Sequence, residues 1–221
     1  MGIAEKLQTI AENVPKVYQA GYDKGKGEGG SSENPLEYAV SLQSSYQGVT
    51  FPDGYELTLD IPYVTSIHSL LFNTKGITKV TLKGNDNGTE INFQQAFREV
   101  STLTEVDLTE INVKPTSISY ICLNCKKLQK ISGVFDMSAC TSATIPFGGC
   151  AELQEIYFKP ETISVSLNIS ASPKLTPECV QSIIDGLATV ETAQTLTLNS
   201  KIVLTDEQKN TISSKGWTLV Q

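Results

Sequence analysis

Two cysteines separated by two residues, Cys122 and Cys125, are the first pattern in the sequence that could carry chemistry. Such a pair can supply two ligands of a zinc site or the two thiols of a redox centre. A zinc site needs about four ligands, and neither a second cysteine pair nor a histidine lies nearby. The total of five cysteines is odd, which favours reduced thiols over a disulfide framework. We therefore expect both cysteines to be small core residues, with no metal and no cofactor.

The single histidine, His68, would have to serve any Ser-His-Asp or Cys-His catalytic arrangement. No Gly-x-Ser-x-Gly motif accompanies it, and the acidic residues occur singly, without the paired carboxylates of a glycoside hydrolase. The segment 84–88 (Gly-Asn-Asp-Asn-Gly) suggests calcium, but Phe97 stands where an EF-hand counted from Asp86 needs a glutamate. A tight turn is the expectation there. We predict that the protein is not an enzyme.

The charge and hydropathy of the 221 residues exclude two classes of partner. Acidic residues outnumber basic ones by 24 to 17, for a net charge of −7, so we expect no nucleic-acid partner. No run of about 18 apolar residues is present, so we expect no membrane insertion. The first residues lack the apolar stretch of a secretory signal. This favours a cytoplasmic or phage-particle location over secretion, and a cell-surface adhesin would need an export signal.

A repeat is the dominant pattern of the chain. Four segments share the frame apolar-x5-Leu/Ile-x2-Val/Ile-x-apolar: residues 71–82, 97–108, 122–133 and 147–158. The Leu/Ile anchors follow one another at intervals of 26, 25 and 25 residues: Ile77, Leu103, Leu128 and Leu153. Gly133 is the one departure, since the frame requires an apolar side chain there. We interpret this as a structural repeat of about 25 residues.

The repeat predicts a solenoid, because one unit of about 25 residues cannot bury its own apolar face and must stack on its neighbours. Residues 80–82 alternate between apolar and polar, so we expect parallel strands stacked about every 25 residues. A second, shorter strand is expected before each anchor, on the opposite side of the core. Its alternating apolar pairs are Ile91 and Phe93, Ile118 and Tyr120, Ala143 and Ile145, and Val165 and Leu167.

Two outward columns of the main strand form a candidate binding face. The first column alternates in charge, and stacking would place each side chain beside an opposite one. Its members are Lys79, Glu105, Lys130 and Glu155. The second column contains Thr81, Asp107, Ser132 and Tyr157. Tyr157 is the best candidate anchor, because tyrosine is enriched among residues that dominate binding energy.

The frame resembles the BspA-like leucine-rich repeats of bacterial proteins, whose core is Ala-Phe-x-x-Cys-x-x-Leu-x-x-Ile-x-Leu. Residues 96–108 and 147–158 carry the resemblance, with Phe97 and Phe147 at the aromatic position. It covers residues 61–158 and implies a curved leucine-rich-repeat solenoid that serves recognition without a catalytic centre. The expected function is a non-enzymatic recognition or scaffolding module. It would bind a protein or glycan through the outward face of the repeat sheet.

The ends of the repeat require caps. We expect an N-terminal cap at residues 35–60, the repeats at 61–158 and an α/β C-terminal cap at 159–221, together forming one solenoid. Thr176 and Thr205 begin two predicted helices, Gly216 ends the second, and residues 217–220 alternate as a strand. This block resembles the C-terminal caps of such repeat proteins in gut bacteria and their prophages.

Residues 1–34 differ from the rest and are expected to form an N-terminal helix and a flexible, glycine-rich linker. Five apolar residues between positions 3 and 17 are spaced as a heptad seam: Ile3, Leu7, Ile10, Val14 and Val17. Three roles stay open for this helix, namely self-association through residues 3–17, docking to a partner, and packing on the cap. The stretch resembles the N-termini of prophage-encoded structural and tail-associated proteins of Firmicutes. The alternative function is therefore a structural or tail-associated component of a phage or prophage particle, assembled through this helix.

Overall fold

The computed structural model describes residues 40–62, 64–85 and 88–221. The predicted N-terminal helix, its seam at residues 3–17 and the linker lie outside the described residues, as do Asp86 and Asn87 of the predicted turn. The described part of the chain is mostly parallel β-sheet with few helices. To that extent the predicted fold class is confirmed.

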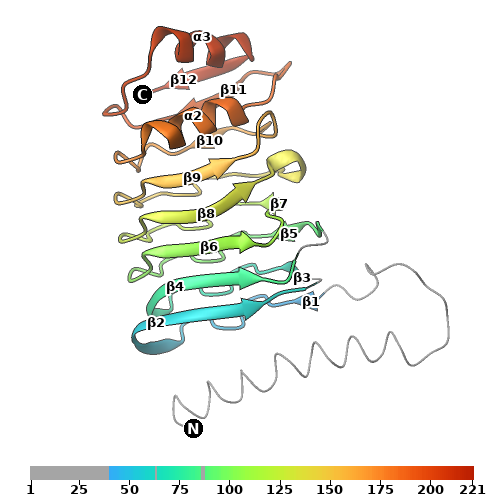
Figure 1. Ribbon diagram of the computed structural model, residues 1–221, viewed down its shortest axis with the longest axis vertical. Helices are drawn as coiled ribbons and strands as arrows, with labels where there is room; N and C mark the ends of the chain where they lie inside the picture. Colours follow the sequence, from blue (N-terminus) through green and yellow to red (C-terminus); the bar gives the residue numbers. More distant parts are fainter. Residues whose placement is uncertain (1–39, 63, 86–87) are drawn as a thin grey trace, which may run out of the picture.

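The long strands form a five-stranded parallel sheet in the order β2-β4-β6-β8-β9. Their bounds are β2 Thr50–Asp60, β4 Lys75–Lys83, β6 Glu105–Glu110, β8 Lys130–Phe135 and β9 Glu155–Phe158. Figure 1 shows the strands one above another along the long axis of the molecule. The register pairs Val80 with Val106, and Val106 with Ile131. Residues at the same position of successive repeats therefore lie side by side and form one buried row across the sheet.

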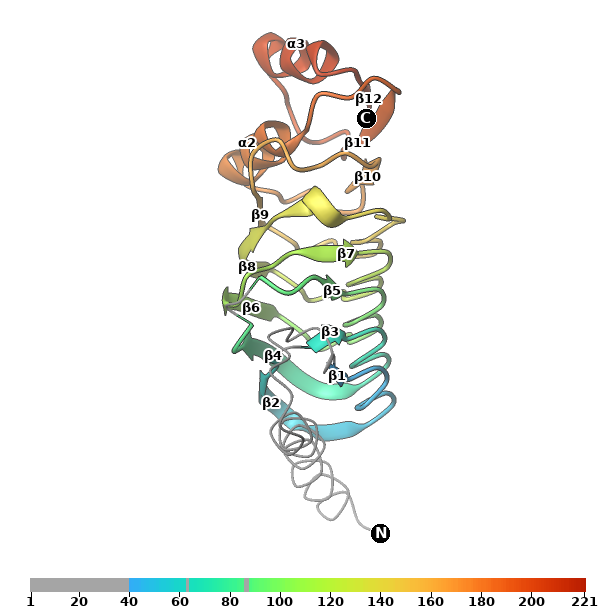
Figure 2. The ribbon, with the colours of Figure 1, turned by 90° about the vertical axis from the view of Figure 1, so that its right-hand side faces the viewer.

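The short strands form a second parallel sheet on the other side of the core, in the order β1-β3-β5-β7 (Figure 2). Their bounds are β1 Val40–Ser41, β3 Val64–Ser66, β5 Ile91–Asn92 and β7 Pro115–Ser117. An isolated bridge from Ser117 to Ser142 extends the sheet by one step. The strand predicted at Val165 and Leu167 was expected to join this sheet. This prediction is wrong, because β10 (Leu167–Asn168) pairs with β11 in a separate sheet.

Two columns of left-handed residues follow the short strands. The first contains residues with φ between 41° and 57°: Ser44, Ser69, Gln95, Tyr120 and Ile145. The second, four positions later, contains Gly48, Asn73, Glu99, Asn124 and Gly149. Each column repeats at intervals of 25 or 26 residues, so residues 40–49 belong to a further copy that the sequence pattern did not reveal. Tyr120 and Ile145, predicted as strand residues, lie instead in a turn and a bend, because positive φ interrupts an extended chain.

Gly133 explains the one departure from the repeat frame. β8 pairs with β9 through Lys130 and Glu155, but the next pair is Val134 with Tyr157, so β8 contains two additional residues. Gly133, with φ of 101°, lies in this bulge. Phe135, which is fully buried, then pairs with Phe158 and fills the apolar row that Gly133 leaves empty.

Two helices and three strands follow the repeats, and the two helices and the last strand lie where the sequence predicts them. Helix α2 (Pro177–Gly186) begins after Thr176, whose hydroxyl accepts a hydrogen bond from the Cys179 N–H. Helix α3 (Asp206–Ser214) begins after Thr205 with a complete capping box. Strands β10, β11 (Gln194–Thr197) and β12 (Trp217–Val220) form a parallel three-stranded sheet.

The buried apolar side chains form one continuous cluster from Leu42 to Trp217. It lies between the two repeat sheets and continues under α2, which packs against β9. Among the described residues, no helix has the length and apolarity needed to cross a membrane.

Candidate functional site

The cysteine pair lies inside the repeat core. Cys122 and Cys125 are fully buried, and the Cys125 thiol donates a hydrogen bond to the Phe97 carbonyl at 2.9 Å. One unit later, the Cys150 thiol donates in the same way to the Cys122 carbonyl at 3.0 Å. Burial raises the pKa of Cys122 and Cys150 well above the usual thiol range. Cys122 and Cys150 therefore stay protonated, and the hydrogen bonds of the Cys125 and Cys150 thiols connect one unit to the next.

The other cysteines and the histidine do not gather with them. Cys179 donates its thiol to the Ile156 carbonyl at 3.1 Å, and burial raises its pKa to about 11. His68 is half-buried, and its Nδ1 has no hydrogen-bond partner in the described part of the chain. Within residues 40–62, 64–85 and 88–221, no three His, Cys, Asp or Glu side chains form a group that could hold a metal ion.

The structure places the eight predicted face residues on one side of the five-stranded sheet, and all of them are half-buried. They come from β4, β6, β8 and β9, two from each strand: Lys79 and Thr81, Glu105 and Asp107, Lys130 and Ser132, and Glu155 and Tyr157. Alternation along each strand is the reason, because the residues between them point into the core.

The charged column forms a ladder across the sheet. Lys79 is the register partner of Glu105, Glu105 of Lys130, and Lys130 of Glu155. The Lys79 Nζ lies 3.0 Å from a Glu105 carboxylate oxygen, and the Lys130 Nζ lies 3.1 Å from a Glu155 oxygen. Each charged residue of the column therefore lies beside residues of opposite charge on the neighbouring strands, as the sequence predicted.

A further ladder residue, Glu56, was missed by sequence reasoning. It is the register partner of Lys79 on β2, which extends the alternation to five strands. The pairing of β2 with β4 is irregular between Tyr55 and Glu56, so the spacing of the repeat does not hold there. The charge ladder thus consists of five residues: Glu56, Lys79, Glu105, Lys130 and Glu155.

Hydrogen bonding sets the charge state of the face. The bond to Glu105 raises the pKa of Lys79, and the bond to Glu155 raises that of Lys130, so both stay cationic well above neutral pH. Hydrogen bonds from Thr109 lower the pKa of Asp107, whose other oxygen lies 3.5 Å from the Lys79 Nζ. Both lysines of the face are thus paired with carboxylates, and the carboxylates outnumber the lysines there.

The polar column departs from the prediction at its last member. Thr81, Asp107 and Ser132 are register partners in turn. Tyr157 does not continue this row, because the bulge at Gly133 places it beside Val134, which is 54% exposed. Burial, together with the Glu155 carboxylate, raises the pKa of Tyr157, so its phenol is a neutral hydrogen-bond donor. Tyr157 and Val134 form an amphipathic patch at one end of the ladder.

Comparison with known proteins finds no protein-family model, no curated protein and no solved structure that matches the chain. The arrangement offers paired lysines, hydroxyls and one phenol on one face of the sheet, and these groups are suited to contact a surface.

Proposed function

We propose that the chain is a BspA-like leucine-rich-repeat solenoid that acts as a non-enzymatic recognition or scaffolding module. The observation that supports this best is the periodicity of the backbone. Left-handed residues recur at intervals of 25 or 26 residues through five copies, and the parallel registers follow the same period. A repeat array of this kind presents an extended surface built from equivalent positions on successive units.

The outward face of β4, β6, β8 and β9 would bind a protein or a glycan. Its two lysines are paired with carboxylates of the same face, so a partner need not supply anions for them. The patch of Tyr157 and Val134 would provide the anchor. An aromatic residue beside an exposed aliphatic one offers apolar area together with a hydrogen-bond donor.

Substitution of the anchor tests the proposal. The whole chain and its Tyr157→Ala variant would be used as baits for protein extracts of the source cells and for a panel of soluble glycans. Val203→Ser is the matched control, since Val203 is 92% exposed and lies outside the repeat sheets. Binding titrations with the captured partner should show an affinity lowered about tenfold or more for Tyr157→Ala.

The control should bind that partner as the unchanged chain does. Equal affinity of all three chains would reject the sheet face around Tyr157 as the binding surface. Turnover of any captured molecule by the unchanged chain would reject the non-enzymatic assignment.

A further inference from the structure

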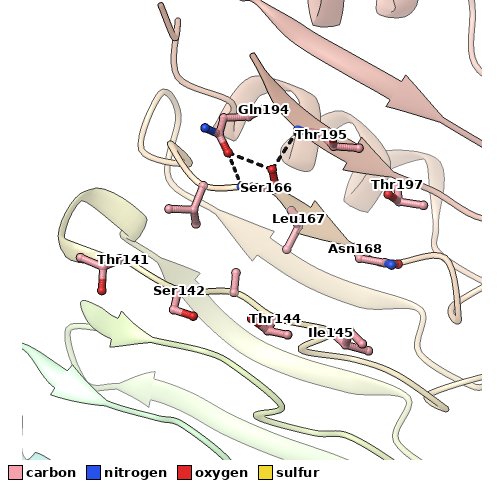
Figure 3. A pocket seen from close by; sticks show the side chains of 12 residues that line it. Thr141, Ser142, Thr144, Ile145, Ser166, Leu167, Asn168, Gln194, Thr195 and Thr197 are labelled. Carbon is pink, nitrogen blue, oxygen red and sulfur yellow. Dashed lines mark hydrogen bonds between the residues drawn. The ribbon is translucent and has the colours of Figure 1, made fainter. Parts of the chain in front are cut away.

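A groove of about 440 Å³ lies on the side of the short strands, where the repeats meet the C-terminal block (Figure 3). One wall is formed by residues 141–145, and the other by residues around β10 and β11. The lining residues are Thr141, Ser142, Ala143, Thr144, Ile145, Val165, Ser166, Leu167, Asn168, Gln194, Thr195 and Thr197. None of these twelve is charged and none is aromatic.

Backbone hydrogen bonds connect each unit to the next along this side of the molecule. In one column the N–H groups of Leu42, Ile67, Phe93 and Ile118 donate to carbonyls of the following unit at 2.9–3.0 Å. In a second column, two residues later, Ser44, Ser69, Gln95 and Tyr120 do the same at 2.9–3.0 Å. Both columns are regular through four successive steps.

The two columns stop at the groove. The next members are Ala143 and Ile145, and in the described part of the chain neither backbone N–H has a hydrogen-bond acceptor. The unit that should supply the carbonyls has turned away, because β10 pairs with β11 and not with residues 141–145. Beyond the bridge at Ser142, the groove is therefore lined by two residues whose backbone N–H groups are unpaired, and the chain leaves the extended conformation at the second of them, Ile145.

Several side-chain acceptors on the opposite wall are already occupied. The Gln194 Oε1 accepts hydrogen bonds from the Ser166 N–H at 2.9 Å and from the Ser166 hydroxyl at 2.8 Å. The Ser166 Oγ in turn accepts from the Thr195 N–H at 3.0 Å. Figure 3 shows this network along the upper wall. Asn168 likewise accepts from Ser170, at 3.1 Å and 2.7 Å.

We propose that this groove binds an extended, uncharged peptide segment of a partner protein by β-strand addition. The peptide carbonyls would accept the hydrogen bonds that Ala143 and Ile145 leave unmade, as an added strand does at an exposed sheet edge. The absence of charged residues from the lining favours an uncharged segment. A glycan fits less well, because the groove offers no aromatic ring for stacking and Gln194, Ser166 and Asn168 already bond within the chain.

This site lies on a different face from the Tyr157 patch and does not depend on it. The bound segment can pair only along residues 141–145, which is about five residues at the rise of a strand, and it must follow the change of direction at Ile145, where φ is 41°. The repeat itself supplies a suitable probe. Residues 141–145 stack on the preceding unit through the carbonyls of Ser142 and Thr144, which accept from Ile118 and Tyr120.

The probe is a capped peptide that copies residues 139–146 with serine in place of Cys140. Amide hydrogen exchange of the whole chain would be measured with and without it. In the free chain, Ala143 and Ile145 should exchange faster than Ile118 and Tyr120, whose N–H groups are bonded. At a peptide concentration ten times its Kd, their exchange should slow about tenfold.

Two controls test the mode of binding. A peptide N-methylated at the residues that copy Ser142 and Thr144 carries methyl groups on the pairing edge and should give no protection. The variant Ala143→Pro lacks one donor and should weaken binding of the unmodified peptide.

Three results would overturn the proposal. The first is slow exchange of Ala143 and Ile145 in the free chain. The second is absence of protection at millimolar peptide, or equal protection by the N-methylated peptide. The third is protection by a neutral oligosaccharide and not by peptide, which would assign the groove to glycans. All three are read from the unsubstituted chain, so they stand even if the proline variant does not fold.

Discussion

Gly133 shows how much of the fold depends on a single residue. Its φ of 101° is a conformation that residues with a side chain rarely adopt, and a Cβ there would lie 2.9 Å from the Leu108 carbonyl oxygen. The bulge that this glycine permits moves Phe135 into the buried row and brings Tyr157 next to Val134. A local backbone requirement therefore determines both the packing of β8 and the position of the candidate anchor.

We expect Gly133→Ala to lower the free energy of unfolding by about 2–3 kcal/mol, because it adds both backbone strain and a close contact. Chemical denaturation followed by circular dichroism would measure the change. Gly54→Ala is the matched control, since Gly54 also has positive φ, of 79°, but nothing lies within 4 Å of its added Cβ. The control should cost about 1 kcal/mol. Equal losses in the two variants would show that the contact with Leu108 is unimportant.

The sequence predicted the burial and position of individual residues best where the repeat frame is unbroken. Cys122 and Cys125 were assigned to core columns from their spacing alone, and both are buried. Prediction failed where β8 contains two additional residues, since the frame cannot show that Phe135 replaces Gly133 in the buried row. It also missed Glu56, because β2 joins the sheet through an irregular register.

At the scale of elements, the charge ladder is a contact between neighbouring strands. Exposed cross-strand pairs each contribute about 0.2–1 kcal/mol. Glu105 lies between Lys79 and Lys130, so it has a cation on each side. The ladder thus favours pairing of each strand with the strand of the next repeat. If one repeat were skipped, residues of like charge, such as Lys79 and Lys130, would lie side by side.

Reversal of that central charge should disturb both neighbours. We expect Glu105→Lys to lower the free energy of unfolding by about 1–2 kcal/mol, and the melting temperature by about 3–6 °C. Differential scanning calorimetry would measure both. Glu191→Lys makes the same change of charge in an exposed loop and should have little effect. The double variant Lys79→Glu, Glu105→Lys should lose less than the sum of the two single losses, because positions 79 and 105 again carry opposite charges, and a strictly additive loss would contradict the ladder.

At the scale of the whole molecule, contacts run from each unit to the next. The strands of the five-stranded sheet pair in chain order, α2 packs on β9, and α3 packs on β12. The sequence predicted this direction of stacking. It did not predict the unpaired N–H groups of Ala143 and Ile145, because the alternating pair Val165 and Leu167 continues the short-strand pattern and gives no sign that β10 pairs elsewhere. The repeat and the C-terminal block are therefore joined more strongly on one side than on the other.

Such an arrangement should unfold locally from its C-terminal end. Ile212 is fully buried on α3, and Ile212→Ala should remove about 2–4 kcal/mol of packing energy. Because each unit touches only its neighbours, we expect amide exchange to accelerate tenfold or more in β11, β12 and α3, while β4 and β6 keep their protection. Leu103→Ala is the control, since it lies within the repeats and should accelerate exchange in β4 and β6. If Ile212→Ala accelerates exchange equally along the chain, the molecule unfolds as one cooperative unit, and the weaker connection at the groove has no energetic consequence.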